Sequence, residues 1–245
     1  MSDVHDRLRR FWDADAQTYD RSPSHAASNP VEAAAWQAVL GRHLPPSSLV
    51  LDVGAGTGAM SLLAASLGHR VTALDLSSEM LGRARAKAEA MSLSLETVLA
   101  PATDPPPGPF DAVIERHVLW TSPDPDAALA AWRRVAPKGR LLVLEGMWNR
   151  EGLAWHLRER AAQVLRPILG VEHHHHSGYD PDLLASLPLA GAVSPEPLLS
   201  AVARAGWRNV AIERLRDVEW ARRLAAPWPL GWLETVRQFA ISADA

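Results

Sequence analysis

Short apolar segments alternate along the chain with longer segments that favour helices. Residues 49–53 (LVLDV) suit a strand buried on both faces of a sheet, and residues 59–67 are rich in good helix formers. The alternation continues, with strands expected at 70–74, 94–99, 110–115, 140–145, 208–215 and 236–242 and helices at 78–90, 124–135 and 195–205. Strands alternating with helices build right-handed βαβ units. The pattern therefore predicts an α/β fold with a doubly wound, mostly parallel, seven-stranded Rossmann-like sheet and helices on both faces.

Two parts of the chain lie outside this alternation. Residues 3–20 predict a helix followed by an irregular segment, and residues 30–43 predict a helix with Pro30 in its first turn, where a missing N–H costs little. Residues 147–193 interrupt the alternation with a helix expected at 151–165. We expect one domain over 1–245, made of an N-terminal helical cap (1–44), a cofactor-binding core (45–146), a cap insertion (147–193) and the C-terminal part of the sheet (194–245).

A glycine-rich loop joins the first strand to its helix. Gly54, Gly56 and Gly58 remove every second side chain, which lets the backbone turn tightly and approach a ligand closely. The following helix begins beside the loop with backbone N–H groups that suit a polar or anionic ligand. The stretch LVLDVGAGTG therefore predicts a loop for a nucleotide-type cofactor.

Polar residues gather where the predicted strands end, which is where ligands bind in an open parallel sheet. Asp75 ends the second strand, and a carboxylate at that place accepts two hydrogen bonds from the vicinal diol of a ribose. Asp52, Arg116, His117 and Glu145 lie at or near other strand ends. A nicotinamide cofactor would use the same groups, and GAGTGA matches G-x-G-x-x-A, so the loop alone leaves the cofactor open.

Four stretches together carry a resemblance to a known family: LVLDVGAGTG, VTALDLSSEMLGRARAKA, FDAVIERHVLW and DAALAAWRRVAPKGRLLVLEG. They resemble the class I S-adenosylmethionine-dependent methyltransferases, especially the ubiquinone/menaquinone-methylase-like branch that acts on small molecules. The resemblance covers roughly residues 10–145. It implies in-line transfer of a methyl group from S-adenosylmethionine to an oxygen, nitrogen or carbon atom of a small acceptor.

The resemblance also implies cofactor contacts. The glycine loop would hold the methionine part, Asp52 would orient the loop and help bind the amino group, and Asp75 would bind the ribose. Where many relatives carry an acidic residue before the adenine-binding alanine, this chain has Pro101, so Asp104 or a backbone carbonyl would substitute. The residues implied are Tyr19, which closes over the cofactor, with Asp52, Gly54, Ala55, Gly56, Gly58, Asp75, Leu76, Met80, Ala102, Thr103 and Arg116. For Arg116, binding of an anionic group and pairing with a surface carboxylate stay open.

The acceptor is expected under a cap made from the N-terminal helices and residues 147–193. His117 is the candidate acid/base group, because its usual pKa near 6.5 suits a general base; a role in shaping the pocket is an equal alternative. For the internal histidine run we weigh a solvated loop, pocket lining and a metal site, and we predict no metal. The acceptor-side candidates are Trp120, Trp148, Trp155, His173, His174, His175 and His176.

Composition narrows the partners. The net charge of −3 gives no general attraction to nucleic acid or anionic membranes, and ERHV stands after the fourth strand in place of an N/D-P-P-Y-type motif. The chain has no cysteine, no apolar run of membrane-spanning length, and a charged N-terminus. We expect a cytoplasmic protein with a small-molecule acceptor and neither nucleic acid nor membrane as partner.

Two other functions remain as alternatives. A nicotinamide-dependent oxidoreductase would need a catalytic Tyr/Lys pair, and the chain has only two tyrosines, with no recognisable pair. A non-catalytic protein could retain the cofactor fold, since fold does not fix function. The oligomeric state, monomer or homodimer, stays open, with the Trp-rich residues 226–236 as a candidate interface.

Overall fold

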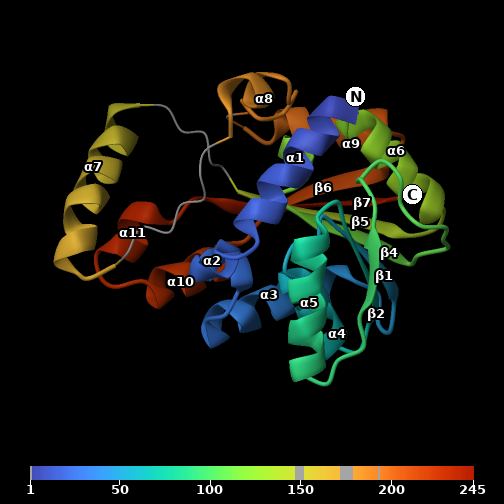
Figure 1. Cartoon of the computed structure of the whole chain (residues 1–245), viewed down its shortest axis with the longest axis horizontal. Coiled ribbons are helices and arrows are strands. Elements are labelled where there is room, and N and C mark those ends of the chain that lie inside the picture. Colours follow the sequence, from blue (N-terminus) through green and yellow to red (C-terminus); the bar gives the residue numbers. More distant parts are fainter. Residues whose placement is uncertain (1, 147–151, 172–178, 193) are drawn as a thin grey trace.

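The computed structural model describes residues 2–146, 152–171, 179–192 and 194–245 (Figure 1). Its strands form one seven-stranded sheet in the order β3-β2-β1-β4-β5-β7-β6. All neighbouring pairs from β3 to β5 are parallel, and β7 runs antiparallel to both β5 and β6. The strands are β1 (Leu49–Val53), β2 (Arg70–Asp75), β3 (Glu96–Leu99), β4 (Ala112–Arg116), β5 (Arg140–Gly146), β6 (Arg208–Arg214) and β7 (Gln238–Asp244).

The helices lie on both faces of the sheet and at its carboxyl edge. Those named here are α1 (Ser2–Asp15), η1 (Tyr19–Arg21), α2 (Pro23–Ala26), α3 (Pro30–His43), α4 (Ala59–Ser66), α5 (Ser78–Ala90), η2 (Leu119–Thr121), α6 (Pro125–Val135), α7 (Leu153–Ile168), α8 (Pro181–Ala185), α9 (Glu196–Arg204), α10 (Arg216–Ala225) and α11 (Leu230–Glu234). No helix among the described residues combines the length and the apolar character needed to cross a bilayer.

The core has two layers because alternate residues of each strand point to opposite faces. Val50 packs on one side in a cluster with Trp36 of α3 and Val218 of α10. Leu51 packs on the other side in a cluster with Trp132 of α6 and residues of α9. The central strands therefore present apolar residues to both layers, as their sequences predict.

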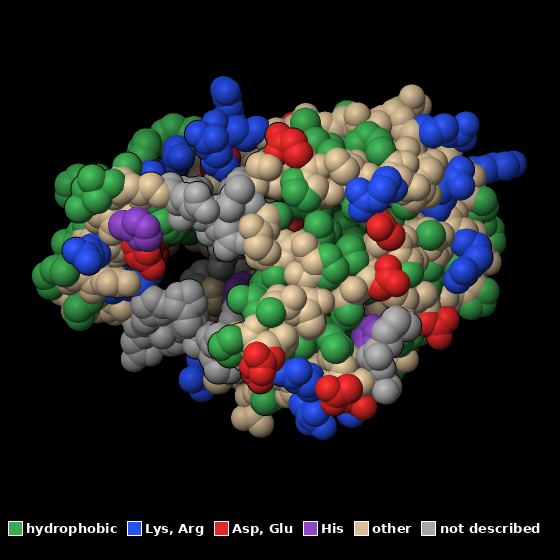
Figure 2. Space-filling model, turned by 90° about the horizontal axis from the view of Figure 1, so that it is seen from above, with side chains coloured by type: hydrophobic (Ala, Val, Ile, Leu, Met, Phe, Trp, Pro, Cys, Tyr) green, Lys and Arg blue, Asp and Glu red, His purple; other side chains and the backbone are tan. Residues whose placement is uncertain are grey.

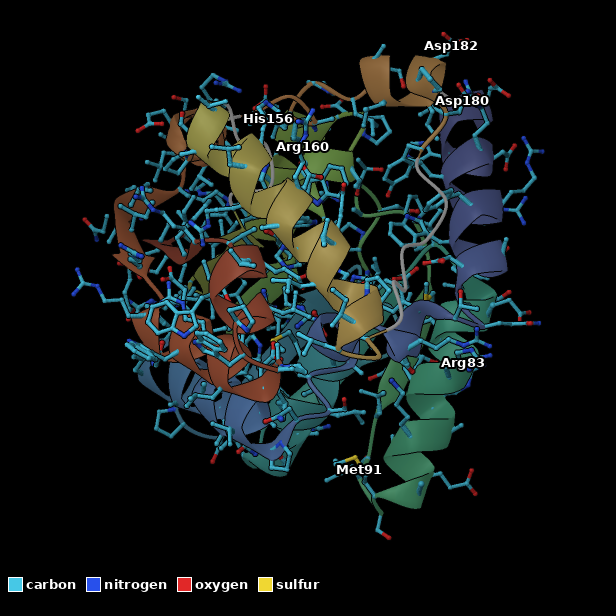
Figure 3. The ribbon with its side chains drawn as sticks, turned by 90° about the vertical axis from the view of Figure 1, so that its left-hand side faces the viewer. Arg83, Met91, His156, Arg160, Asp180 and Asp182 are labelled. Atoms are coloured by element: carbon cyan, nitrogen blue, oxygen red, sulfur yellow. The ribbon has the colours of Figure 1, made fainter. Side chains whose placement is uncertain are left out.

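The N-terminal helix and the two helices after β5 lie away from the main layers. α1 packs against α5, and the side chain of Ser77, the N-cap of α5, donates to Asp13 of α1 at 2.6 Å. Asp180, the N-cap of α8, pairs with Arg7 of α1 at 2.8 Å, and Figure 3 shows Asp180 beside α1. α7, which carries His156 and Arg160, stands apart at the left of Figure 1 and packs against α11.

The predicted α/β fold and its seven strands are confirmed. The C-terminal part differs from expectation, because α10 and α11 occupy the segment between β6 and β7, where no element was predicted. On the surface, positive and negative side chains are intermixed over the face in Figure 2, and that face is hollowed beside α7.

Candidate active site

The glycine loop between β1 and α4 has left-handed backbone at all three glycines, with φ of 63°, 55° and 86° at Gly54, Gly56 and Gly58. A Cβ on Gly54 would lie 2.2 Å from Cγ2 of Val118, and one on Gly58 would lie 3.0 Å from Cβ of Ala84. Gly54 thus lets the loop approach the segment after β4, and Gly58 lets α4 pack against α5. Gly58 thus permits close packing of the two helices, and its contact with the cofactor stays a prediction.

Asp75 ties this loop to the end of β2. The carboxylate is buried and accepts hydrogen bonds from the backbone N–H of Gly56 and of Ser77, both at 2.8 Å. Burial raises the pKa of Asp75 to about 6, and the backbone hydrogen bonds oppose that rise. Each carboxylate oxygen accepts one of these bonds and can accept more. The two bonds therefore hold the Asp75 carboxylate in position and leave it able to accept hydrogen bonds from a diol.

Asp52 and Arg116 line a small polar pocket together with Tyr19, His25 and the glycine loop. Asp52 accepts a hydrogen bond from the hydroxyl of Ser61 at 2.5 Å, and burial raises its pKa to about 7. The Arg116 guanidinium donates to the carbonyl of His25, and burial lowers its pKa. Arg116 therefore belongs to the lining of the polar pocket. An acidic and a basic group in one pocket fit the amino-acid end of a cofactor, which carries an ammonium and a carboxylate.

Arg116 also lies against Trp36 of α3, with its Cζ 5.7 Å from the ring centroid. Arg222 of α10 lies against the same ring at 5.6 Å and pairs with the buried Glu32 at 2.8 Å. Cations are attracted to an indole face, more strongly away from water. Trp36 thus links the arginine of the polar pocket to α10.

The N-terminal segment contributes Tyr19 and His25 to the lining of the polar pocket. The Tyr19 ring stacks on His25 at 4.2 Å, and burial raises its pKa to about 12. Asp20 accepts a hydrogen bond from Thr57 of the glycine loop at 2.7 Å and pairs with Lys87 of α5 at 2.7 Å. Sequence reasoning did not single out Asp20 or His25, which lie outside the quoted motifs, and it gave no role to Thr57 of the glycine loop because its partner Asp20 lies 37 positions away.

The adenine-side candidates lie near Asp75. The loop after β3 starts beside it, since the N–H of Ala100 donates to the carbonyl of Asp75 at 3.0 Å. Leu76 packs beside Leu8 of α1, and Met80 is buried in α5. The carbonyl of Ala102 accepts a hydrogen bond from the indole N–H of Trp132 at 2.7 Å. Thr103 follows in the same loop and is half-buried.

His117 follows β4 in a left-handed conformation, φ 65°, which is uncommon outside glycine. Its Nδ1 lies 2.9 Å from Oε2 of Glu145, which is only 2% exposed. Burial lowers the pKa of His117, and burial together with the charge of Glu115 raises the pKa of Glu145. Glu115 is itself buried with its pKa raised to about 8. The site therefore contains an imidazole oriented by a buried carboxyl group.

A second, larger pocket of about 260 Å³ begins at Glu145 and is mainly apolar. Trp120 lines it, as predicted, and so does Tyr179, whose ring lies 5.7 Å from that of Trp120 and stacks on Phe11 at 4.4 Å. The described residues that line it are Trp120, Glu145, Gly146, Tyr179, Leu184, Leu189, Ala190, Ala192, Ser194, Leu198 and Phe239. Sequence reasoning missed Tyr179, although it follows the histidine run closely.

Of the remaining acceptor-side candidates, the structure describes only Trp155. Trp155 lies on α7 and is not among the described residues that line either pocket. Trp148, His173, His174, His175 and His176 lie outside the described residues. In the described part of the chain, no three acidic or histidine side chains are grouped so that they could hold a metal ion.

Comparison with known proteins identifies the class. A model of the methyltransferase domain family matches residues 51–144. The chain is 31% identical over 222 residues to a ubiquinone biosynthesis O-methyltransferase of Xanthomonas campestris, covering 89% of this chain and 81% of that protein. Its fold matches 1,6-didemethyltoxoflavin-N1-methyltransferase of Burkholderia thailandensis, solved with 1,6-didemethyltoxoflavin and S-adenosylhomocysteine, with a TM-score of 0.61 at 18% identity over 97% of this chain and 87% of that one.

The chain belongs to the class I S-adenosylmethionine-dependent methyltransferases. Within that class its sequence is similar to ubiquinone biosynthesis O-methyltransferases, including one of Xanthomonas oryzae that is 34% identical over 177 residues, 69% of each chain. The protein is thus an enzyme that transfers a methyl group from S-adenosylmethionine to a small molecule. The nicotinamide-dependent and non-catalytic alternatives receive no support from these relatives.

Proposed function

We propose that the acceptor atom is a hydroxyl oxygen and that His117, oriented by Glu145, removes its proton. The observation that carries this proposal is the 2.9 Å contact between Nδ1 of His117 and Oε2 of Glu145. The pair joins the two pockets, because Arg116 before His117 lines the polar one and Glu145 lines the apolar one. The sequence relatives named O-methyltransferases support the choice of oxygen.

The polar pocket has the chemistry to hold the cofactor. We propose that Asp52 takes its ammonium, Arg116 its carboxylate and Asp75 its ribose, with Tyr19, Gly54, Ala55 and Gly56 around the methionine part. Leu76, Met80, Ala102 and Thr103 would flank the adenine. When bound, S-adenosylmethionine supplies an electrophilic methyl group on a sulfonium centre. The chain's part is to align the acceptor with that methyl group and to exclude water.

An oxygen acceptor needs a base more than an amine does. A phenol has a pKa near 10, as for tyrosine, so its proton must leave as the new bond to carbon forms. Nδ1 of His117 is engaged by Glu145, and the other ring nitrogen, Nε2, would take the acceptor proton. The ionised form of Glu145 stabilises the resulting imidazolium, so we expect the rate to rise as the buried pair loses a proton.

The cap proposed to cover the acceptor is supported by the lining of the apolar pocket. Tyr179, Leu184, Leu189, Ala190 and Ala192 all come from the 147–193 segment. The domain division, the cytoplasmic location and the absence of nucleic-acid and membrane partners remain predictions from the sequence. So does an interface at 226–236, where Trp228 and Trp232 are exposed.

The proposal is tested with His117→Asn, because asparagine tolerates the left-handed backbone at this position but cannot act as a base. Methylation of a panel of phenols and aromatic amines is followed by mass spectrometry against pH. We expect phenols as substrates, kcat reduced at least about 100-fold in the variant, and loss of the acidic limb of its pH profile. S-adenosylhomocysteine affinity should change less than about threefold.

His43→Asn is the matched control, since His43 also contacts a glutamate, Glu213 at 2.7 Å, but lies outside both pockets. Its rate should match the wild type. Wild-type kcat in His117→Asn across the pH range would exclude the base role. Methylation of the amines alone would exclude an oxygen acceptor.

A further inference from the structure

Three buried side chains, which we call the triad, join α3 to α10, two helices that pack against each other (Figure 1). Oε1 of Glu32 accepts a hydrogen bond from Nε of Arg222 at 2.8 Å and another from the indole N–H of Trp36 at 3.2 Å. The side chains of Arg222 and Glu32 are 9% and 2% exposed, and Trp36 is fully buried. Replacing a buried ion pair by apolar residues of similar volume is often neutral or stabilising, so stability alone does not account for this pair.

The triad fixes the Trp36 ring, and that ring supports Arg116. The indole N–H is bound by Glu32, and Cζ of Arg222 lies 5.6 Å from the ring centroid. Cζ of Arg116 lies 5.7 Å from the same centroid, and its guanidinium also donates to the carbonyl of His25. A shift of the indole would therefore move the surface against which the Arg116 guanidinium lies.

The charge of Arg222 acts on the site, although Arg222 is not among the described residues that line either pocket. Burial lowers the pKa of Arg116, and the charge of Arg222 acts in the same direction. Burial and the charges of Arg116 and Arg222 together lower the pKa of His117. Nη2 of Arg222 is buried and has no hydrogen-bond partner in the described structure. Two guanidinium groups near one ring favour the binding of an anionic ligand group beside them.

We propose that Glu32 and Arg222 are positioning residues for the carboxylate of the cofactor. Through the Trp36 ring they hold the Arg116 guanidinium where it binds that carboxylate. The proposal rests on the assignment of Arg116 to the cofactor carboxylate made above, and it adds two residues that line neither pocket among the described residues. Since Arg222 belongs to α10, a helix between β6 and β7 contributes to cofactor recognition although the glycine loop lies far from it in the sequence.

The test compares two ligands that differ only in the carboxylate. S-adenosylhomocysteine carries it, whereas S-adenosyl-3-thiopropylamine keeps the ammonium, the thioether and the nucleoside without it. Calorimetry at one fixed pH gives both dissociation constants, and their ratio reports recognition of the carboxylate alone. We expect the wild-type enzyme to bind S-adenosylhomocysteine about 10- to 100-fold more tightly. Arg116→Met should bring this ratio to within about threefold of one.

Two changes at the triad should lower the ratio about fivefold. Arg222→Met removes the charge and keeps much of the side-chain length. Glu32→Gln/Arg222→Met removes both charges, so it leaves no unpaired buried carboxylate if the single variant fails to fold. In the Arg116→Met background, Arg222→Met should lower the ratio no further, because it acts through Arg116. Glu219→Gln is the matched control, since Glu219 is another buried carboxyl of α10, paired with Arg214 at 2.8 Å, and should leave the ratio unchanged.

The outcomes separate this proposal from the proposed function. A ratio that falls in Arg116→Met but is unchanged in both triad variants would overturn the positioning role and leave the proposed function intact. A wild-type ratio near one, or a ratio unaffected by Arg116→Met, would remove the assignment of Arg116 and the positioning role with it. A further fall caused by Arg222→Met in the Arg116→Met background, or an equal fall in Glu219→Gln, would overturn the positioning role as well.

Discussion

The two pockets of this enzyme differ in whether the chain itself supplies hydrogen-bond partners for their buried polar groups. In the polar pocket, Asp52 accepts from Ser61 and Arg116 donates to the carbonyl of His25, and next to it Asp75 holds two backbone N–H groups. In the apolar pocket, Trp120 and Tyr179 have polar atoms with no partner among the described residues. The chain itself therefore prepares the cofactor half, whereas the acceptor half is completed by its ligand. Changes in the first should alter cofactor affinity, and changes in the second should alter acceptor selection.

The largest expected effect comes from the glycine loop. Gly54→Ala places a methyl group 2.2 Å from Cγ2 of Val118, a branched side chain with little freedom to move. We expect S-adenosylhomocysteine binding, measured by calorimetry, to weaken at least about 100-fold because the loop must shift away from its ligand position.

Gly68→Ala separates this clash from backbone strain. Gly68 also has a positive φ, 88°, but a Cβ there meets no atom within 4 Å. The substitution should lower the free energy of unfolding by roughly 1–2 kcal/mol and leave the cofactor affinity unchanged. Equal binding by Gly54→Ala and Gly68→Ala would show that the loop does not approach the cofactor.

A smaller effect is expected from pH. Burial raises the pKa of Asp52 to about 7, so without cofactor the protonated form is favoured well above the usual value near 3.9. The stability linked to this group is present at low pH and is lost as pH rises through about 7. A cofactor ammonium prefers the carboxylate, so S-adenosylhomocysteine affinity should rise several-fold between pH 5.5 and 8, with proton release on binding.

Asp52→Asn is the control for that pH effect, because its amide oxygen can still accept from Ser61 but the group does not titrate. Calorimetry across the same pH range should give a flatter profile, retaining the contribution of Asp75, whose pKa burial raises to about 6. A pH dependence identical to that of the wild type would contradict the assignment of Asp52 to the ammonium.

The smallest effect concerns the wall of the apolar pocket. Leu184 lines it and is 40% exposed, so Leu184→Ala removes only part of a buried side chain. The KM for the acceptor should rise about threefold, equivalent to roughly 0.7 kcal/mol of lost apolar contact, with no change in cofactor affinity. Leu67→Ala at the end of α4, where exposure is also 40%, should leave both constants unchanged. A shift in cofactor affinity would show that the pockets are not independent.

The fold and the cofactor half could be predicted because their signals are local. LVLDVGAGTG contains strand, turn and helix start in ten consecutive residues, and Asp75 ends the next strand. A contiguous apolar run or glycine spacing is visible in sequence without any knowledge of tertiary contacts.

The acceptor half could be predicted only in part. Trp120 and His117 follow a predicted strand, so the sequence alone identified both as candidates for the acceptor side. Tyr179 gains its role from contact with an aromatic ring of α1, which is distant in the sequence. Glu115 raises the pKa of Glu145 because their strands, β4 and β5, lie side by side in the sheet. No helix was predicted after β6, although Val218 and Ala221 lie three residues apart on one buried side of α10; residues 226–236 were interpreted only as a candidate interface.

The contact of Trp36 with both Arg116 and Arg222 has a consequence for recombining this protein with its relatives. Arg222 of α10 and Arg116 of the polar pocket depend on the same ring of Trp36. Arg222 also pairs with Glu32 of α3, although the two residues are separated by 190 positions in the chain. A chimera that takes its C-terminal helices from a relative would therefore have to take the matching N-terminal helix as well. Crossover points that keep α3 and α10 from the same parent should give functional hybrids far more often than points that divide them.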